Sequence, residues 1–248
     1  MRSKIHELLI ELRFNGMANV LDRELDHAQK QGLSVSEALY RLLMEEYSFR
    51  QERSLNNRLK YAKIPWDWSI KTFPFDKQPG VSKHQIQELA GLSFIDRAEN
   101  IVFIGNTGTG KSGLASSILR LALVEGYRGR YYNAQDLLDE LYASLADRSS
   151  AKLIKRLSQY DLLLIDELGY LTLKPEQVNA FFKLMEERYR RKATIITTNL
   201  DYPDWYDLFK RKALVDALLD RLKHYCITIR IDGPSLRVPI HKRNKSRK

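Results

Sequence analysis

The chain has 248 residues, of which 44% are hydrophobic, and a formal net charge of +10. This composition is typical of a soluble globular protein, and no apolar run approaches the roughly 20 residues of a membrane-spanning helix. The single cysteine, Cys226, excludes an intrachain disulfide and a cysteine-based metal site. We therefore expect a cytoplasmic protein without a membrane partner, whose positive charge favours polyanionic ligands.

Residues 1–63 have a helical pattern and are expected to form a small all-helical N-terminal domain. Four apolar residues recur at the spacing of one buried helix face: Ile5, Leu8, Leu9 and Leu12. Ser34 and Glu37 match the capping box that begins a helix. Because this block holds no strand pattern and no cluster of catalytic residue types, we expect it to serve oligomerisation or partner binding.

Residues 64–83 change in character and are expected to form a connector. The stretch contains Pro65, Trp66, Trp68, Phe73, Pro74, Phe75 and Pro79. The prolines disfavour a helix, and the aromatic side chains argue against a free linker. We expect the connector to lie on the surface of the domain that follows.

Residues 84–237 alternate between short apolar runs and stretches with helical periodicity. The expected strands are 101–104, 130–132, 162–165, 194–198 and 227–231, and clear helical stretches are 112–125, 136–146 and 176–191. This alternation predicts an α/β fold in which a parallel sheet is covered by helices on both faces. A basic tail, residues 238–248, follows this domain.

The most specific motif comes directly after the expected strand at 101–104. It matches the phosphate-binding loop G-x-x-x-x-G-K-[ST] through Gly105, Asn106, Thr107, Gly108, Thr109, Gly110, Lys111 and Ser112. The glycines let backbone N–H groups surround phosphates, and the helix that follows adds a favourable dipole. Lys111 is expected to reach the β- and γ-phosphates of ATP, and Ser112 to bind Mg²⁺.

Two later strands also end in polar residues. Asp166 and Glu167 follow the aliphatic run at 162–165, the pattern of a Walker B strand. Asp166 is expected to hold Mg²⁺, and Glu167 to polarise the attacking water as a general base. Asn199 follows the strand at 194–198, at the position from which an asparagine contacts the γ-phosphate in ATPases with an extra strand between the two motifs.

Two arginines are candidates for stabilising the charge that spreads over a phosphoryl group during its transfer. Arg221 lies in a helical stretch, and such a residue can act on the nucleotide of a neighbouring subunit. Arg237 could act within its own subunit. Each residue alone is compatible with an ordinary surface arginine, and their order after Asn199 is what favours the functional interpretation.

Several segments of the chain resemble the IstB/DnaC group of AAA+ ATPases. They are Phe94–Asn100, Ala134–Leu138, Tyr160–Leu171 and Asp220–Leu222. The similarity extends over essentially the whole chain, and it is closer to IstB, the helper ATPase of insertion-sequence transposons, than to the helicase loader. The segment Asp166–Leu171 and the short helical N-terminus carry that distinction.

The resemblance implies a role for each matching residue. Lys111 and Ser112 take the Walker A positions, and Asp166 and Glu167 take the Walker B positions. Asn199 corresponds to sensor 1, Arg221 to the arginine finger that reaches a neighbour's nucleotide, and Arg237 to the second sensor. Two departures stand out: Asn106-Thr107, where relatives often have two prolines, and Gly113, where a histidine commonly precedes Leu-Ala.

The family also carries a helical insert before the Walker B strand, and residues 136–159 fill that place. Four basic residues there are candidates for DNA contacts: Arg148, Lys152, Lys155 and Arg156. Lys242 and Arg243 in the tail are further candidates. Such contacts would be to phosphates, and hence weakly selective for sequence. The alternatives are a solvated helix face and a tail that only improves solubility.

The resemblance implies an ATPase that assembles as a homo-oligomer on double-stranded DNA, with ATP at the subunit interfaces, and that regulates a cognate transposase. A loader of a replicative helicase is the main alternative, and pull-down with helicase or transposase would separate the two. A small-molecule kinase of the P-loop class is a third reading, but Asn199, Arg221 and the basic tail have no evident role in it.

Overall fold

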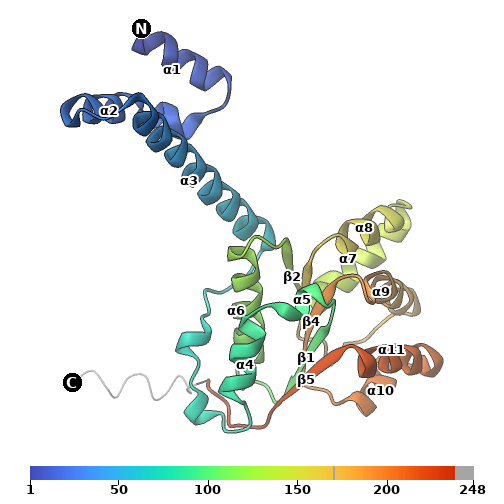
Figure 1. Ribbon diagram of the computed structural model, residues 1–248. Coiled ribbons are helices and arrows are strands. Elements are labelled where there is room, and N and C mark those ends of the chain that lie inside the picture. The colour runs from blue at the N-terminus through green and yellow to red at the C-terminus, as the bar shows by residue number, and fades with distance from the viewer. Residues whose placement is uncertain (170, 238–248) are drawn as a thin grey trace, which may run out of the picture. The chain divides into compact units, whose positions relative to one another are not determined.

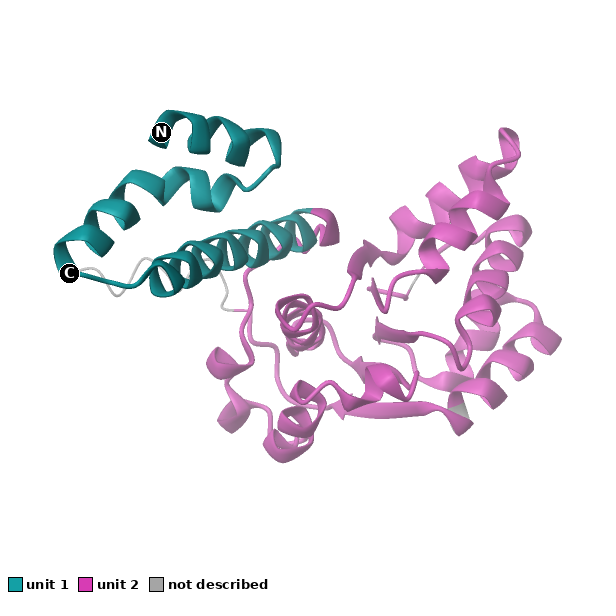
Figure 2. Cartoon of the chain, turned by 45° about the horizontal axis from the view of Figure 1, so that its top comes forward, with its two compact units in different colours: residues 1–60 teal, residues 61–248 magenta. Residues whose placement is uncertain are grey.

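The computed structural model describes residues 1–169 and 171–237, apart from the side chain of Lys223. The chain divides into two compact units, Met1–Lys60 and Tyr61–Lys248 (Figure 2). The helical block was expected to end at residue 63, and helix α3 (Val35–Ala62) does run slightly past the division. The basic tail, with Lys242 and Arg243, lies outside the described residues.

The first unit consists of α1 (Arg2–Glu11), α2 (Asn15–Gln31) and most of α3. The capping box at the start of α3 forms as the sequence suggests. The Ser34 backbone N–H donates to Glu37 Oε2 at 2.8 Å, and the Glu37 N–H donates to Ser34 Oγ at 3.3 Å. Because these two bonds satisfy N–H groups that have no partner within the helix, they set its first turn.

The predicted buried face of α1 is wrong for the single chain. No residue of α1 is buried, and Leu8 and Leu12 are 56% and 62% exposed. The small core of this unit is made by α2 and α3, through Met17, Leu21 and Leu42, and only Leu9 of α1 packs against it. Helical spacing identifies an apolar stripe, but it does not say whether anything in the same chain covers it.

The second unit is built on one sheet of five parallel strands, in the order β2-β3-β4-β1-β5. The strands are β1 (Asn100–Gly105), β2 (Gly129–Asn133), β3 (Leu162–Asp166), β4 (Ala193–Thr198) and β5 (Cys226–Ile231). Every expected strand is present, with bounds that differ by at most one residue. The predicted α/β fold with a parallel sheet is confirmed.

Helices cover both faces of this sheet, as Figure 1 shows. The helices are α4 (Lys83–Ala90), α5 (Ser93–Asp96), α6 (Lys111–Val124), α7 (Ala134–Ala146), α8 (Ser150–Ser158), α9 (Pro175–Arg188), α10 (Trp205–Phe209) and α11 (Lys212–His224). Successive strand residues point to opposite faces. Thus Ile101 and Phe103 of β1 pack with α4, α5 and α6, whereas Val102 packs with the helices from α7 to α11.

The connector lies along the face of the sheet that α6 covers. It contains two short 3-10 helices, η1 (Ile70–Thr72) and η2 (Phe75–Lys77). Outside the connector, a third 3-10 helix, η3 (Tyr202–Asp204), precedes α10. Phe73 is buried in the same core cluster as α6, and its ring packs edge-on against Phe75 at 4.8 Å between centroids. Phe73 and Phe75 of the connector are therefore part of the second unit's core.

The strand order brings three functional segments to one edge. β4 lies between β3 and β1, and parallel strands end at the same side of a sheet. Gly105, Asp166 and Thr198 are the last residues of β1, β3 and β4, so the segments that follow them are neighbours.

Within the described ranges, no helix combines the length and the apolar character that crossing a bilayer requires.

Candidate functional site

The phosphate-binding loop joins the end of β1 to the start of α6. Gly108 and Gly110 have φ angles of +85° and +95°, in the left-handed region where glycine is favoured. Both are also tightly enclosed, because a Cβ at Gly110 would lie 2.6 Å from Phe73 Cε2, and one at Gly108 would lie 2.2 Å from Ser235 Oγ. The loop shape therefore depends on these two glycines and on two distant segments that pack against them.

Lys111, the first residue of α6, has its ammonium group inside the loop. Its Nζ donates hydrogen bonds to the carbonyl oxygens of Gly105 and Asn106, each at 2.8 Å. Burial lowers the pKa of Lys111, and the nearby carboxylates of Asp166 and Glu167 oppose that shift. The loop thus holds a cation against two of its own carbonyl groups, and that positive charge is available to anionic phosphates.

Asp166 ends β3 and is fully buried. The Thr197 hydroxyl donates to its Oδ1 at 2.5 Å, and the Tyr131 hydroxyl donates to its Oδ2 at 3.1 Å. Burial, together with the charge of Asp166, raises the pKa of Tyr131, so the phenol remains a hydrogen-bond donor. Asp166 is therefore a carboxylate with both oxygens oriented by neutral donors on β4 and β2.

Glu167 follows Asp166 with a φ of +62°, which turns its side chain out of the sheet edge. Its backbone N–H donates to Thr197 Oγ1 at 2.9 Å, so the same threonine positions both acidic residues. Asn133, at the end of β2, donates from Nδ2 to Glu167 Oε2 at 3.1 Å. Sequence reasoning missed Asn133, because only the register that pairs it with Asp166 places it beside the carboxylate.

Asn199 and Arg237 approach the same space from other segments. A Cβ at Gly169 would lie 2.3 Å from Asn199 Oδ1, so this glycine leaves room for the asparagine. The Leu236 N–H donates to the Gly108 carbonyl at 2.8 Å, which fixes the C-terminal segment on the phosphate-binding loop. Arg237 follows, and its charge contributes to the lowered pKa of Lys111.

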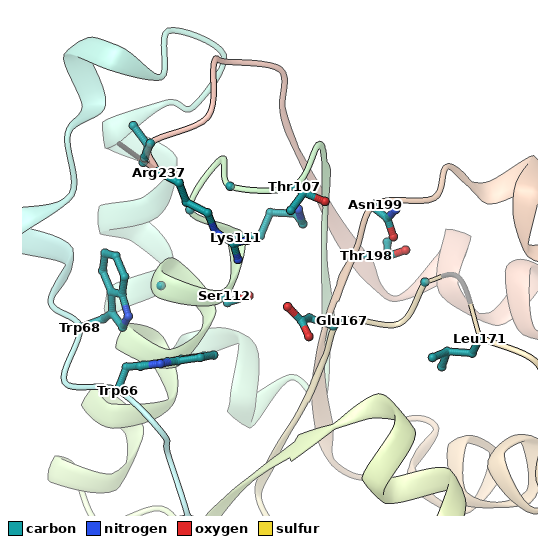
Figure 3. A pocket seen from close by; sticks show the side chains of 15 residues that line it. Trp66, Trp68, Thr107, Lys111, Ser112, Glu167, Leu171, Thr198, Asn199 and Arg237 are labelled. Carbon is teal, nitrogen blue, oxygen red and sulfur yellow. The ribbon is translucent and has the colours of Figure 1, made fainter. Parts of the chain in front are cut away.

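These residues enclose a cavity of about 520 Å³ (Figure 3). It is lined by Trp66, Trp68, Thr107, Gly108, Gly110, Lys111, Ser112, Gly113, Glu167, Gly169, Leu171, Thr198, Asn199, Leu236 and Arg237. Asp166 lies behind this lining, and Thr109 is buried, with its hydroxyl donating to the Asn106 carbonyl at 2.9 Å. The cavity therefore unites most of the residues expected from the sequence with two tryptophans that no motif assigned.

Arg221 is the exception among the candidate catalytic residues. It lies on α11, and its guanidinium donates to Glu186 Oε1 at 3.1 Å and stands 5.7 Å from the centre of the Tyr189 ring. It is not among the residues that line the cavity. Within one chain, Arg221 therefore lies apart from the other candidate residues.

The candidate DNA contacts lie on a different part of the second unit. Arg148 is in the turn between α7 and α8, and Lys152 and Lys155 are exposed on α8. Arg156 forms an ion pair with Glu140, with 2.6 Å between the guanidinium nitrogen and the carboxylate oxygen. Lys155 also lines a second hollow of about 460 Å³, together with Lys183, Arg191 and Lys192. The α8–α9 surface thus gathers basic residues, although Arg156, Arg191 and Lys192 each have an acidic partner, respectively Glu140, Glu187 and Asp161.

Sequence comparison shows which proteins this chain is similar to. The family described as "IstB-like ATP binding protein" matches residues 7–246. The chain is 36% identical over 238 residues to the ATP-binding protein of insertion sequence IS5376 from Geobacillus stearothermophilus, covering 96% of this chain and 95% of that one. It is 32% identical over 235 residues to the IS21 ATP-binding protein from Pseudomonas aeruginosa, covering 95% and 89%.

Structure comparison gives the same fold from more distant proteins. The DnaC helicase loader superposes with a TM-score of 0.56 at 23% identity, covering 68% of this chain and 99% of that one. The replication initiator DnaA, in a structure with AMPPCP and single-stranded DNA, has a TM-score of 0.56 at 20% identity and covers 67% and 50%. At such identities the likeness shows the fold alone, that of AAA+ proteins.

Proposed function

The chain belongs to the family of IstB-like ATP-binding proteins and has the AAA+ fold, and from this premise we propose that it hydrolyses ATP. The observation that carries the proposal is the meeting of Lys111, Glu167 and Asn199 in one cavity at the edge of the sheet. A phosphate-binding loop alone requires only that phosphate is bound. A carboxylate and an amide facing the same cavity provide for an attacking water.

Each side chain has a distinct task in this proposal. Lys111 neutralises the β- and γ-phosphates as charge develops on them. Glu167 accepts the proton of the attacking water, and Asn199 orients that water against the γ-phosphate. Arg237 adds positive charge from the C-terminal segment. Glu167 and Asn199 directly follow strands of the sheet, so their backbone positions are set before the nucleotide binds. The Lys111 ammonium exchanges its bonds to the Gly105 and Asn106 carbonyls for bonds to phosphate.

The residues fit a magnesium ion that is held mainly by the nucleotide. No group of three or more histidine, cysteine or acidic side chains capable of holding a metal occurs among residues 1–169 and 171–237. Mg²⁺ in such sites keeps several waters and binds one or two protein oxygens plus the phosphates. Ser112 Oγ and the buried carboxylate of Asp166 would supply those oxygens, and the ion would neutralise phosphate charge.

We further propose that the protein works as an oligomer on double-stranded DNA, with Arg221 of one subunit completing the cavity of the next. The position of Arg221 outside its own cavity supports this arrangement. The basic residues on α8 and the net charge of +10 support contact with DNA phosphates. Lys152 and Lys155, both exposed on α8, would make that contact.

The relatives named as ATP-binding proteins of insertion sequences support a transposase as the partner. In this proposal the DNA-bound oligomer regulates the transposase and the choice of target site in DNA transposition. Loading of a replicative helicase is the second candidate, favoured by the fold likeness to the DnaC helicase loader. Pull-down with the two partners separates these functions.

The test is phosphate release from ATP with and without duplex DNA, together with particle size. We expect DNA to stimulate release and ATP to promote larger particles. Glu167→Gln should bind ATP and assemble but lose turnover by about 10² to 10⁴-fold, because only the general base is removed. Lys111→Ala should lose binding itself. Two results would contradict the proposal. One is ATP turnover that persists in Glu167→Gln. The other is turnover that duplex DNA does not stimulate, in a protein whose particle size does not increase with ATP.

A further inference from the structure

The cavity extends beyond the groups that hydrolysis uses, to the indoles of Trp66 and Trp68. Both belong to the connector and both line the cavity, with exposed fractions of 46% and 39%. Figure 3 shows them on the side of the cavity opposite Glu167 and Asn199. Exposed tryptophans beside a deep polar site are unusual unless they bind something, because an indole is large and mostly apolar.

The two indoles are held in place by the rest of the second unit. Asp67, between them, forms an ion pair with Arg120 of α6 at 3.0 Å. The ring of Trp66 meets the ring of Tyr131 edge-on, with 6.2 Å between centroids and an interplanar angle of 83°. The same Tyr131 hydroxyl donates to Asp166, so the connector is braced against the acidic end of the site.

Trp68 lies directly against the first turn of α6. A Cβ at Gly113 would come within 3.0 Å of Trp68 Cε3 and 3.1 Å of its Cδ2. Such contacts are closer than van der Waals distance, so the indole occupies space that a side chain at position 113 would fill. Gly113 therefore permits Trp68 to reach the cavity wall immediately beside Lys111 and Ser112.

We propose that Trp68, supported by Trp66, binds the nucleobase of a purine nucleoside triphosphate by stacking. The inference rests on the proposed binding of the nucleotide's phosphates by the loop at residues 105–112. Because Glu167 and Asn199 are proposed to face the γ-phosphate, the base end of the nucleotide lies toward the opposite wall of the cavity, where Gly113 and the Trp68 indole stand. The flat apolar faces of an indole and a purine match each other there.

The alternative use of these residues is purely structural, with the indoles closing the surface of α6. That alternative predicts that losing Trp68 loosens the loop and affects every ligand of the cavity. Stacking predicts instead that only ligands with a base are affected. Inorganic tripolyphosphate has the phosphate chain without a base, so it separates the two explanations and also reports independently on the phosphate-binding loop.

The experiment measures dissociation constants for ATP and for tripolyphosphate by calorimetry in the presence of Mg²⁺. Trp68→Ala should weaken ATP binding about tenfold and leave tripolyphosphate binding unchanged. Trp68→Phe, which keeps an aromatic face, should stay close to the unsubstituted protein. Tyr142→Ala is the matched control, because Tyr142 is 38% exposed and is not part of the cavity lining.

Two results would overturn the proposal. One is an equal weakening of ATP and tripolyphosphate in Trp68→Ala, which would make the indole a support of the loop. The other is unchanged ATP binding in that variant. Neither result depends on turnover, so a protein that binds ATP through Trp68 without hydrolysing it would refute the proposed hydrolysis and leave the stacking intact.

Discussion

The cavity side of the sheet and the Arg221 side of α11 differ in how firmly their charged groups are held. Thr197 bonds both the Asp166 carboxylate and the Glu167 backbone N–H, and Asn133 bonds the Glu167 carboxylate. Arg221 has one ion pair, with a Glu186 side chain that is 63% exposed. Exposed ion pairs contribute little free energy, so Arg221 can exchange its partner at small cost. The side chains of the cavity are preorganised, whereas the Arg221 side chain can leave Glu186 for another partner at small cost in free energy.

This difference suggests a division of labour between subunits. In the proposed mechanism, a preorganised cavity binds nucleotide in any subunit, and full turnover requires the Arg221 guanidinium of a neighbouring subunit.

Arg221→Ala should lower ATP turnover in the assembled state about 10³-fold, because an arginine finger stabilises the charge of the transition state. ATP affinity should change little, and the free energy of unfolding should fall by less than about 1 kcal/mol, as for other exposed pairs. Arg97→Ala is the control, since Arg97 has a similar ion pair with Glu99 at 2.9 Å. Unfolding by denaturant and phosphate release measure both quantities, and a large loss of stability in Arg221→Ala would contradict the comparison.

Thr197→Val should lower the free energy of unfolding by about 2 to 3 kcal/mol, because it leaves the buried Asp166 with one donor fewer. It should also reduce turnover, since the Glu167 backbone loses its acceptor. Thr197→Ser keeps the hydroxyl and should recover most of both losses. If Thr197→Val were as stable as the unsubstituted protein, Thr197 would not organise the acidic pair.

Asn133→Ala should reduce turnover about tenfold with ATP affinity unchanged, because the Glu167 carboxylate loses its positioning donor. Asn133 also caps α7, accepting from the Gln135 N–H at 3.0 Å, so about 1 kcal/mol of stability should be lost as well. Asn133→Asp retains the cap but brings a like charge to Glu167. Turnover that fell in Asn133→Ala but recovered in Asn133→Asp would assign the effect to the cap and not to Glu167.

Gly113→Ala should have the smallest effect. The added methyl group would displace the Trp68 indole by a few tenths of an ångström, weakening ATP binding about threefold without affecting tripolyphosphate. Alanine also favours a helix over glycine by up to about 1 kcal/mol, so the variant should be at least as stable. Calorimetry and thermal unfolding check the two parts, and weaker binding of tripolyphosphate would point to a damaged loop.

The strands of the sheet and the catalytic motifs were predictable from sequence because each consists of residues that are adjacent in the chain. Buried parallel strands appear as continuous apolar runs, such as Leu162–Ile165, and the phosphate-binding loop is one contiguous motif. Asn133, Trp66 and Trp68 could not be found this way. Their positions beside Glu167 and Gly113 depend on strand register and on how the connector packs, which no local pattern encodes.

The exposed face of α1 is a case in which a local sequence pattern predicted burial that the structure does not show. Its spacing predicted burial, but Leu8, and Leu12 just after the helix, are more than half exposed in the part of the chain that the structure describes. A periodic stripe identifies a surface that is suited to packing, but it does not identify the partner that covers it. The same limit applies to Arg221, whose proposed partner is the cavity of another subunit.

Mixing Glu167→Gln with Arg221→Ala at equal concentration, with ATP and duplex DNA, tests whether Arg221 acts on a neighbour's nucleotide. Each variant alone is expected to be inactive. If Arg221 acts on a neighbour's nucleotide, about a quarter of the interfaces in a mixed oligomer join an intact Glu167 to an intact Arg221. Phosphate release should then recover to a substantial fraction of the unsubstituted rate. A mixture that stays as inactive as its components would show that each cavity depends on its own Arg221, and would contradict the account.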